Sequence, residues 1–501
     1  MTVATAGVLE VVNPATLDVV GSVAADDPSS APARVSAAAA AQSSWAERTP
    51  RERAGALRAL LRIVLARADE IADTVIAETA KPRVEAFTTE LFPAADALAW
   101  LARSAPRLLA PDRVRFTQPH LLHKRGRTVY EPLGVVAVIA PWNFPFAIPF
   151  TQAAFAVAAG NAVVLKPSEL TPLSGALVAS LFAEVGAPVT VLQGGGDVGA
   201  ALVEAPGVAK VVFTGSGEVG RKVAAAAGAR LLPVTLELGG KDPMLVLDDA
   251  DLPRAVSGAL WASFMNCGQV CSGVERIYVE GALYEPFVEE LVRRTHEAQI
   301  GPLISEEQRA RVEGLVADAV ARGARTLTGG TAPDRTGWFF EPTVLADVPA
   351  DARIQHEETF GPVVTVQRVA DERAAVAAAN ERAYGLGASV WTRDAARAAR
   401  LAGKLRAGTV WHNDHAYSYA TAQASWGGLG ASGFGRTHSS HGLYDLTAVK
   451  FVDRDGGRLG VPWWFPYDDG SSFRGVLRAM YGRAYWRERR ALFSLMRRYR
   501  L

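Results

Sequence analysis

Apolar residues along the chain follow two different spacings, and each spacing predicts a different kind of element. From about residue 31 to residue 103, apolar positions recur every three or four residues in segments rich in Ala, Leu and Arg, which predicts helices. Beyond residue 132, short apolar runs end at Gly, Pro or Asn and alternate with helical segments such as 173–185. These runs predict buried strands at 135–139, 162–165, 190–192 and 210–213.

A second series of the same kind follows Gly239. Its apolar runs predict strands at 243–247, 276–279, 363–366 and 388–391, with helices near 283–298 and 371–379. Strands that alternate with helices indicate parallel sheets connected by crossover helices. The predicted fold class is therefore α/β, with two doubly wound, Rossmann-like domains and a ligand cleft between them.

Composition places this fold in an ordinary globular protein with one unusual end. The chain has 501 residues, 49% hydrophobic and 21% charged, which suggests two or more domains. A net charge of +1 argues against a general attraction to nucleic acid. Residues 457–501 nevertheless contain ten Arg and three acidic residues, a net charge of +7, so the remainder carries −6.

Cysteine content and the N-terminal sequence both favour a cytoplasmic protein. Two cysteines cannot form a disulfide framework, and residues 1–5 lack the basic and apolar regions of a signal peptide. The most apolar stretch, 133–159, contains three prolines, so strand, loop and helix are favoured over a membrane span. Two cysteines and no paired His cluster also predict that there is no metal site.

Three motifs carry candidate chemistry. Cys271 lies in Asn-Cys-Gly-Gln-Val-Cys-Ser-Gly at 266–273, where small neighbours would let a substrate approach the thiol. Glu237 lies in the glycine-rich turn Leu-Glu-Leu-Gly-Gly-Lys at 236–241, where a carboxylate could activate water. Asn143, in Pro-Trp-Asn-Phe-Pro at 141–145, offers an amide donor to a developing oxyanion. The set suits covalent catalysis followed by hydrolysis.

In this order, the three motifs resemble the aldehyde dehydrogenase superfamily of NAD(P)-dependent enzymes. The resemblance extends from about residue 11 to about residue 452. Further matching blocks are Leu-Lys-Pro-Ser-Glu at 165–169, Phe-Thr-Gly-Ser at 213–216, Glu-Thr-Phe-Gly-Pro at 358–362 and Ser-Gly-Phe-Gly-Arg at 432–436.

The resemblance implies a division of the chain into parts. Residues 1–112 and 133–239 would form the NAD-binding domain, and residues 240–424 the catalytic domain. Residues 113–132 and 436–455 would supply strands for oligomerisation, as a homodimer or a homotetramer. Residues 456–501 would be a basic, aromatic C-terminal extension beyond the usual end of the family.

The resemblance also implies a reaction. The Cys271 thiolate would attack an aldehyde to give a thiohemiacetal, hydride would pass to the nicotinamide, and Glu237 would activate the water that hydrolyses the thioester. Asn143 and the Cys271 backbone N–H would hold the oxyanion. Relatives that transfer the acyl group to coenzyme A usually lack this glutamate, so hydrolysis is favoured. Acylation of coenzyme A and a non-catalytic cofactor-binding scaffold are the alternatives. Cys267 is interpreted as a packed thiol rather than a redox partner.

The predicted cofactor site begins at the turn Gly-Ser-Gly-Glu-Val-Gly at 215–220, which follows a predicted strand and opens a helix. By resemblance, Glu169 meets the adenosine ribose, and its carboxylate favours NAD over NADP because it would repel a 2′-phosphate. Glu358 matches the residue that binds the nicotinamide ribose, and Phe360 the ring that packs beside the nicotinamide. The predicted cofactor residues are Trp142, Lys166, Ser168, Glu169, Gly215, Ser216, Val219, Leu238, Glu358 and Phe360.

Substrate and partners are predicted more coarsely. Trp142, Phe144 and Trp426 lie near motifs that wall the family's substrate tunnel, which suggests a small apolar or aromatic aldehyde. No Arg adjoins Cys271, and Arg276 is assigned to a strand. For residues 457–501 we favour docking on a neighbouring subunit, with Trp463 and Trp464 as anchors. Peripheral contact with an anionic membrane and a disordered tail are the alternatives.

Overall fold

The computed structural model describes residues 4–5, 7–118, 121, 123–456, 464–465, 470–482, 490 and 497. The chain divides into two compact units. Unit 1 comprises Met1–Leu108 and Pro132–Thr447, and unit 2 comprises Leu109–Glu131 and Ala448–Leu501. Every predicted catalytic and cofactor-binding residue falls in unit 1.

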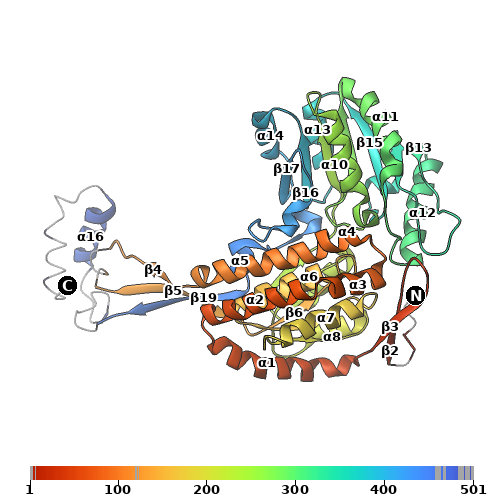
Figure 1. Ribbon diagram of the computed structural model, residues 1–501. Coiled ribbons are helices and arrows are strands. Elements are labelled where there is room, and N and C mark those ends of the chain that lie inside the picture. The colour runs from red at the N-terminus through yellow and green to blue at the C-terminus, as the bar shows by residue number, and fades with distance from the viewer. Residues whose placement is uncertain are drawn as a thin grey trace. The chain divides into compact units, whose positions relative to one another are not determined.

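The N-terminal part of unit 1 is largely helical, as the three-to-four-residue spacing predicts. A small antiparallel sheet comes first, and then long helices connected by short turns, seen in red and orange in Figure 1. Helix α2 starts with a capping box, in which Thr49 and Glu52 satisfy each other's backbone N–H groups. The elements are β1 (Ala4–Thr5), β2 (Val8–Val12), β3 (Val19–Ala24), α1 (Ala31–Glu47), α2 (Pro50–Ala66), α3 (Ala68–Thr79) and α5 (Phe92–Leu108).

The first sheet of unit 1 has six strands in the order β18-β10-β9-β6-β7-β8, parallel except for β18. Its strands are β6 (Val135–Ile139), β7 (Ala162–Lys166), β8 (Val189–Val191), β9 (Val208–Thr214), β10 (Val234–Glu237) and β18 (Gly433–Phe434). Every residue of β6 and β7 is buried, which explains why these strands are apolar, apart from Lys166 at the end of β7, rather than alternating.

Helices cover both faces of this sheet. Residues 135, 137 and 139 share a core cluster with α1, α8 (Gly196–Glu204) and α9 (Gly217–Ala229). On the other face lies α6 (Ala147–Ala159), all of whose residues are buried because α2 and α5 pack over it. Helix α7 (Pro172–Ala183) follows β7. The stretch 133–159 is thus strand, loop and helix, as predicted.

The second sheet of unit 1 has seven strands in the order β13-β14-β15-β12-β11-β16-β17, parallel except for β13. The predicted helices near 283–298 and 371–379 appear as α11 and α13, and two apolar clusters fill the two faces. The elements are β11 (Asp242–Val246), α10 (Leu252–Phe264), β12 (Val274–Glu280), α11 (Tyr284–Arg294), α12 (Glu306–Ala321), β13 (Arg325–Thr328), β14 (Thr343–Ala346), β15 (Val363–Val369), α13 (Glu372–Asn380), β16 (Gly387–Trp391), α14 (Ala395–Ala402) and β17 (Thr409–His412). The α/β class with two parallel sheets is confirmed.

Among its described residues, unit 2 contains a three-stranded sheet in the order β19-β5-β4 and the helix α16. Its elements are β4 (Asp112–Val114), β5 (Arg125–Pro132), β19 (Thr447–Arg454) and α16 (Ser471–Tyr481). Lys124 pairs with Asp453 at 2.8 Å, and Lys450 pairs with Glu131. These strands coincide with the segments predicted for oligomerisation, a role that stays a prediction. Of the two predicted anchors, Trp463 lies outside the described residues.

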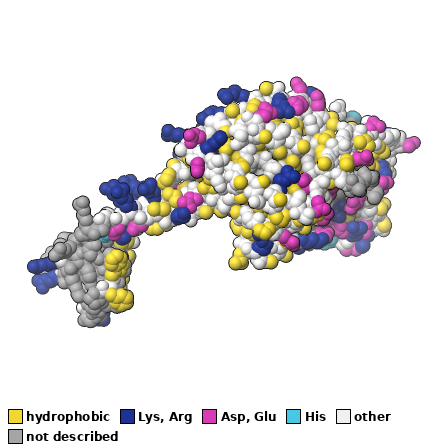
Figure 2. Space-filling model, turned by 90° about the horizontal axis from the view of Figure 1, so that it is seen from below, with side chains coloured by type: hydrophobic (Ala, Val, Ile, Leu, Met, Phe, Trp, Pro, Cys, Tyr) yellow, Lys and Arg dark blue, Asp and Glu magenta, His cyan; other side chains and the backbone are white. Residues whose placement is uncertain are grey.

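Two surface features bear on partners. In the described part of the chain, no helix is both long and apolar enough to cross a membrane. On the face of unit 1 seen in Figure 2, basic and acidic side chains are interspersed rather than gathered by sign.

Candidate active site

The loop that carries Cys271 connects α10 to β12 through a turn of unusual backbone conformation. Asn266 and Cys267 adopt left-handed φ values of 51° and 57°. Gly268 also has a positive φ, and a side chain there would collide with the carbonyl of Gly361. The Cys271 loop is therefore packed directly against the turn that follows Phe360. Cys267 is buried in an apolar cluster, in line with its interpretation as a packed thiol.

Asn143 is held against this loop by hydrogen bonds. Its Nδ2 donates to the carbonyl of Gln269 at 3.0 Å, and Nδ2 of Asn266 donates to the Asn143 carbonyl at 3.0 Å. The Gln269 side chain is fixed in turn, because it donates to Asn266 O at 3.1 Å and accepts from Ile304 N at 2.9 Å. The second amide hydrogen of Asn143 has no acceptor among the described residues.

A buried ion pair supports Asn143 from the other side. Lys81 Nζ lies 2.6 Å from Glu90 Oε1 and donates to the Asn143 carbonyl at 2.9 Å. The second oxygen of Glu90 accepts from the N–H groups of Phe146 and Ala147, at the start of α6. Sequence reasoning missed Lys81 and Glu90, because nothing in the local pattern around residues 81–90 connects them with residue 143.

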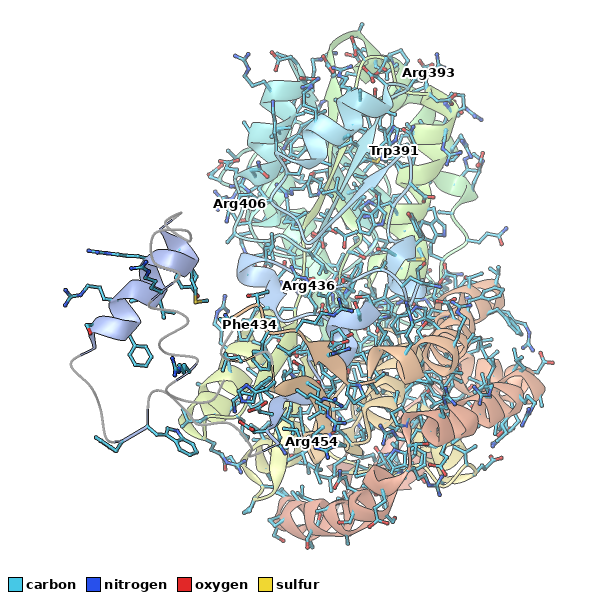
Figure 3. The ribbon with its side chains drawn as sticks, turned by 90° about the vertical axis from the view of Figure 1, so that its left-hand side faces the viewer. Trp391, Arg393, Arg406, Phe434, Arg436 and Arg454 are labelled. Atoms are coloured by element: carbon cyan, nitrogen blue, oxygen red, sulfur yellow. The ribbon has the colours of Figure 1, made fainter. Side chains whose placement is uncertain are left out.

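Glu237 ends β10, where it pairs with Thr214 of β9 and Gly433 of β18. Burial raises the pKa of its carboxyl to about 8, although Arg436 and the Trp426 indole oppose the rise. Among the described residues, no hydrogen bond of standard geometry reaches either carboxylate oxygen of Glu237. Figure 3 shows Arg436 and Phe434 on the segment that borders this strand. Glu237 is therefore poised to exchange a proton near neutral pH.

Three carboxyl groups affect the pKa of the Cys271 thiol. Burial raises the pKa of the Cys271 thiol, and Glu237, Asp242 and Glu358 raise it further in that order of strength. The thiol is therefore protonated at neutral pH and needs a base to become nucleophilic. The turn that follows Glu237 lies against the Cys271 loop, because a side chain at Gly240 would collide with the carbonyl of Cys271.

An apolar cavity of about 160 Å³ opens onto Cys271. It has no charged side chain among its lining residues, and the hydroxyls of Thr88 and Thr89 already donate to helix carbonyls. Phe144 and Trp426 line it as predicted, whereas Trp142 does not. The lining residues are Thr88, Thr89, Pro93, Phe144, Ile148, Trp261, Met265, Val270, Cys271, Ser272, Ala416, Tyr417, Tyr419, Ala420 and Trp426.

Trp142 instead packs on the predicted cofactor residue Phe360. Their ring centroids are 5.4 Å apart with the planes nearly perpendicular. Arg276 is likewise occupied within the protein, because it is buried in β12 and donates to the carbonyls of Lys241, Ala378 and Ala379. It is not available to bind a substrate carboxylate.

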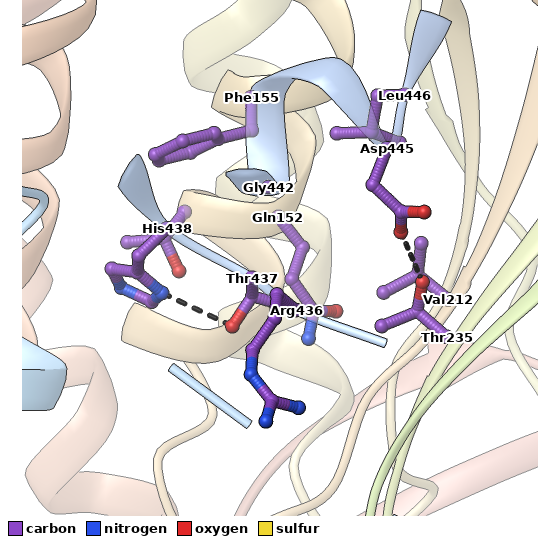
Figure 4. Close-up of a pocket in the computed structure, with 11 residues that line it drawn as sticks. Gln152, Phe155, Val212, Thr235, Arg436, Thr437, His438, Gly442, Asp445 and Leu446 are labelled. Atoms are coloured by element: carbon purple, nitrogen blue, oxygen red, sulfur yellow. Dashed lines mark hydrogen bonds between the residues drawn. The ribbon is translucent and has the colours of Figure 1, made fainter. Parts of the chain in front are cut away.

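A smaller cavity of about 20 Å³ lies next to Thr235, two residues before Glu237 (Figure 4). Gln152, Arg436, Thr437 and His438 are among its lining residues. Gln152 Nε2 donates to Thr214 Oγ1 at 2.7 Å, while its Oε1 has no hydrogen-bond partner among the described residues. The cavity has room for about one water molecule, close to the strand that carries Glu237.

The predicted cofactor residues lie mostly where parallel strands of the first sheet end. Trp142 follows β6, Lys166 ends β7, and the turn Gly215–Ser216 follows β9, in neighbouring positions of the sheet. Ser216 caps α9 by accepting from Val219 N at 3.3 Å, so the exposed start of this helix can face phosphate. The carboxyl edge of such a sheet is the usual location for a dinucleotide.

Residues for the two riboses also fit a dinucleotide. Lys166 Nζ lies 3.2 Å from Glu169 Oε2, and the Ser168 hydroxyl shapes the turn between them by accepting from Leu170 N. Leu238 packs against Gly220 of α9. Glu358 accepts from Gly240 N at 2.9 Å, and a side chain at Gly239 would occupy the place of this carboxylate.

A second buried ion pair, also missed from sequence, connects the catalytic and cofactor turns. Lys241 pairs with Glu275, whose carboxylate also accepts from the N–H groups of Thr359 and Phe360 at 2.9–3.1 Å. The turn that follows Glu237 is thereby fixed to the turn that holds Phe360. Among the described residues, no group of His, Cys, Asp and Glu is arranged to hold a metal ion.

Two mainly parallel α/β sheets and a cysteine thiol that opens onto an apolar cavity suit an enzyme with a dinucleotide cofactor and a cysteine nucleophile. The chain belongs to the aldehyde dehydrogenase family, since the profile described as "Aldehyde dehydrogenase family" matches residues 2–452. The cofactor is accordingly NAD or NADP.

Three relatives illustrate the similarity. The chain is 39% identical to succinate-semialdehyde dehydrogenase [NADP(+)] GabD of Escherichia coli, over 89% of this chain and 94% of that protein. It is 36% identical to 4,4'-diapolycopene aldehyde oxidase of Methylomonas sp, over 87% and 84%. Betaine aldehyde dehydrogenase of Staphylococcus aureus in complex with NAD+ superimposes with a TM-score of 0.87 at 33% identity, over 93% and 95% of the two chains.

Proposed function

We propose that this enzyme oxidises an apolar or aromatic aldehyde to the carboxylic acid, with NAD as the preferred cofactor. The observation that carries the substrate class is the cavity at Cys271, which has aromatic and aliphatic walls and no charged side chain. An aldehyde with a carboxylate tail would be desolvated there without a partner, which is costly. An apolar tail gains free energy from the same burial.

In the proposed first step, Glu237 accepts the thiol proton of Cys271, and the thiolate attacks the carbonyl carbon. A pKa near 8 makes Glu237 a base of suitable strength at neutral to mildly alkaline pH. The alkoxide that forms is stabilised by Nδ2 of Asn143 and by the backbone N–H of Cys271. Bound NAD would accept the hydride, and the acyl group would remain on Cys271 as a thioester.

In the second step, water hydrolyses the thioester. Glu237 first releases the Cys271 proton to solvent and then takes a proton from the water, whose oxygen attacks the acyl carbon. Cys271 leaves as a thiolate and takes that proton back from Glu237. The small cavity beside Thr235 and Gln152 is a suitable location for that water before the attack. The same carboxylate therefore serves both steps.

The preference for NAD rests on Glu169. Its carboxylate can accept hydrogen bonds from ribose hydroxyls but repels a 2′-phosphate. Lys166, 3.2 Å away, offsets part of that repulsion and leaves NADP as a weaker alternative. The other assigned cofactor residues are proposed on their positions at the strand ends.

The chain's organisation is proposed on similar grounds. Residues 1–112 and 133–239 would bind NAD, residues 240–424 would carry Cys271, and the strands of unit 2 would join subunits into a homodimer or homotetramer. Both cysteines are free thiols, which suits a reducing cytoplasm.

The test is an assay of the purified full-length enzyme with NAD and aldehydes of graded polarity. We expect formation of NADH with the highest kcat/KM for apolar and aromatic aldehydes, and loss of activity in Cys271→Ala. Cys267→Ala, the matched thiol control, should retain activity. If none of the aldehydes gives NADH in a reaction that depends on Cys271, the proposal is wrong. A thioester product that appears only when coenzyme A is added would favour acyl transfer instead.

A second candidate substrate is an aldehyde with a quaternary ammonium tail. Trp261, Tyr417, Tyr419 and Trp426 all line the cavity, and aromatic faces attract such cations. The Staphylococcus aureus relative is named for betaine aldehyde. Comparison of betaine aldehyde with its neutral isostere 3,3-dimethylbutanal distinguishes the two, because only a cation–π site prefers the charged compound.

A further inference from the structure

Unit 2 differs from unit 1 in charge. Its sequence contains 17 Lys and Arg and 7 Asp and Glu, a net charge of +10, whereas unit 1 carries −9 of the chain's total of +1. Part of this charge lies in residues 109–131, and most lies in residues 453–501, beyond the family match. The family fold therefore does not account for the basic end.

Large apolar side chains are exposed on the same unit. On α16, Leu477 is 59% exposed and Tyr481 is 69% exposed, and these residues lie one helical turn apart on one face. Arg474 and Arg478 lie one turn apart on the adjoining face. Trp464 is 66% exposed. Val476 of the same helix is buried.

This combination of basic and apolar side chains favours one kind of partner over others. A basic face beside exposed Leu and Tyr, with an exposed Trp on the same unit, suits a surface that offers negative charge at its boundary and an apolar medium just beneath it. Nucleic acid supplies the charge but no apolar medium. Unit 1 of another subunit shows interspersed charges on the face seen in Figure 2 rather than an acidic patch.

We propose that α16 and Trp464 dock the enzyme on an anionic lipid surface. Leu477, Tyr481 and Trp464 would enter the interface between headgroups and acyl chains, while Arg474, Arg478 and the other basic residues of unit 2 would contact lipid phosphates. The advantage to the enzyme rests on the proposed function, because apolar aldehydes concentrate in membranes. The binding itself does not depend on turnover.

The first experiment is co-sedimentation of the full-length protein with vesicles. We expect binding to phosphatidylcholine vesicles that contain 30% phosphatidylglycerol to be at least tenfold tighter than to pure phosphatidylcholine, and to weaken as salt is raised. Equal binding to both kinds of vesicle, or no binding to either, would overturn the proposal. NADH formation in vesicle-free buffer tests the proposed function separately.

Point variants locate the surface. Arg474→Gln should weaken binding to anionic vesicles about fivefold, as expected for one basic residue near a charged membrane. Leu477→Asn combined with Tyr481→Ser should weaken it at least tenfold. The matched controls in unit 1 are Arg393→Gln and Leu231→Asn, because Leu231 is 93% exposed. Equal losses in the controls would contradict docking through α16.

The remaining outcome concerns a second copy of the chain. The mass of the oligomer, measured by light scattering without lipid, should be unchanged by the α16 variants. Circular dichroism should confirm that the variants are folded. If the variants dissociate the oligomer but sediment with vesicles as the wild type does, α16 docks on a subunit and the lipid proposal is wrong.

Discussion

Two buried glutamates of unit 1, Glu90 and Glu237, have opposite surroundings. Glu90 accepts hydrogen bonds from Lys81 and from two backbone N–H groups, whereas Glu237 has no such partner among the described residues. Burial raises the pKa of both carboxyls. Because of its partners, Glu90 holds α6 and, through Lys81, Asn143 in place. Glu237, which lacks such partners, remains available to accept or donate a proton.

The largest effect should come from Glu237→Gln, which keeps the shape of the side chain and removes its base. We expect steady-state turnover to fall about 10²–10⁴-fold, the range for loss of a general base. Because Glu237 is proposed to serve both steps, single-turnover measurements should show slower formation of NADH and slower hydrolysis of the acyl enzyme. Glu204→Gln, at an exposed position, is the control. Unchanged turnover in Glu237→Gln would refute its assignment as the base.

Lys81→Met tests the supporting side of the comparison. Glu90 would be left buried without its cation, so the free energy of unfolding should drop by about 3–5 kcal/mol. The double variant Lys81→Met/Glu90→Gln should lose less, because it leaves no unpaired charge.

The control for that experiment is the exposed pair Arg83–Asp73 on the same segment. Arg83→Met should cost less than about 1 kcal/mol in urea unfolding, as surface pairs generally do. If Lys81→Met and Arg83→Met lowered the free energy of unfolding by equally small amounts, the buried pair would not hold the Asn143 segment in the way we infer.

The pH dependence of stability should also distinguish the two glutamates. Below pH 4.5 Glu237 is protonated in both the folded and the unfolded states. Between pH 4.5 and about 8 only the unfolded chain releases the proton, so this carboxyl destabilises the fold increasingly as pH rises. Glu237→Gln should therefore match the wild type near pH 4 and unfold at a higher temperature at pH 8–9. A constant difference in Tm across this range would contradict the raised pKa.

The smallest expected effect concerns a third glutamate, Glu169, which extends the comparison. Its carboxylate is partly exposed and lies 3.2 Å from Lys166 Nζ. Glu169→Gln should raise kcat/KM with NADP relative to NAD by about tenfold, since one like-charge repulsion is removed. Glu184→Gln, exposed and outside the predicted cofactor residues, serves as the control.

Some parts of the site were open to sequence reasoning because their chemistry is local. Cys271, Glu237 and Asn143 each stand in a motif whose neighbours mark it, and the structure connects the Asn143 amide to the Cys271 loop. Trp142 shows the limit of that reasoning. The motif suggested a place in the substrate wall as well as in the cofactor site, but its ring lies against Phe360 and the cavity is lined without it.

The sequence alone determined the α/β class and most strand positions and pointed to a candidate nucleophile loop, because apolar periodicity and short motifs depend on neighbours along the chain. Only the tertiary structure decided that Lys81 supports residue 143, that Glu275 fixes Thr359 and Phe360, and that Thr88 and Trp426 share one cavity. These contacts join residues far apart in sequence, and the burial that raises the pKa of Glu237 arises from the same packing. A local sequence pattern does not predict which distant groups will exclude water from a side chain.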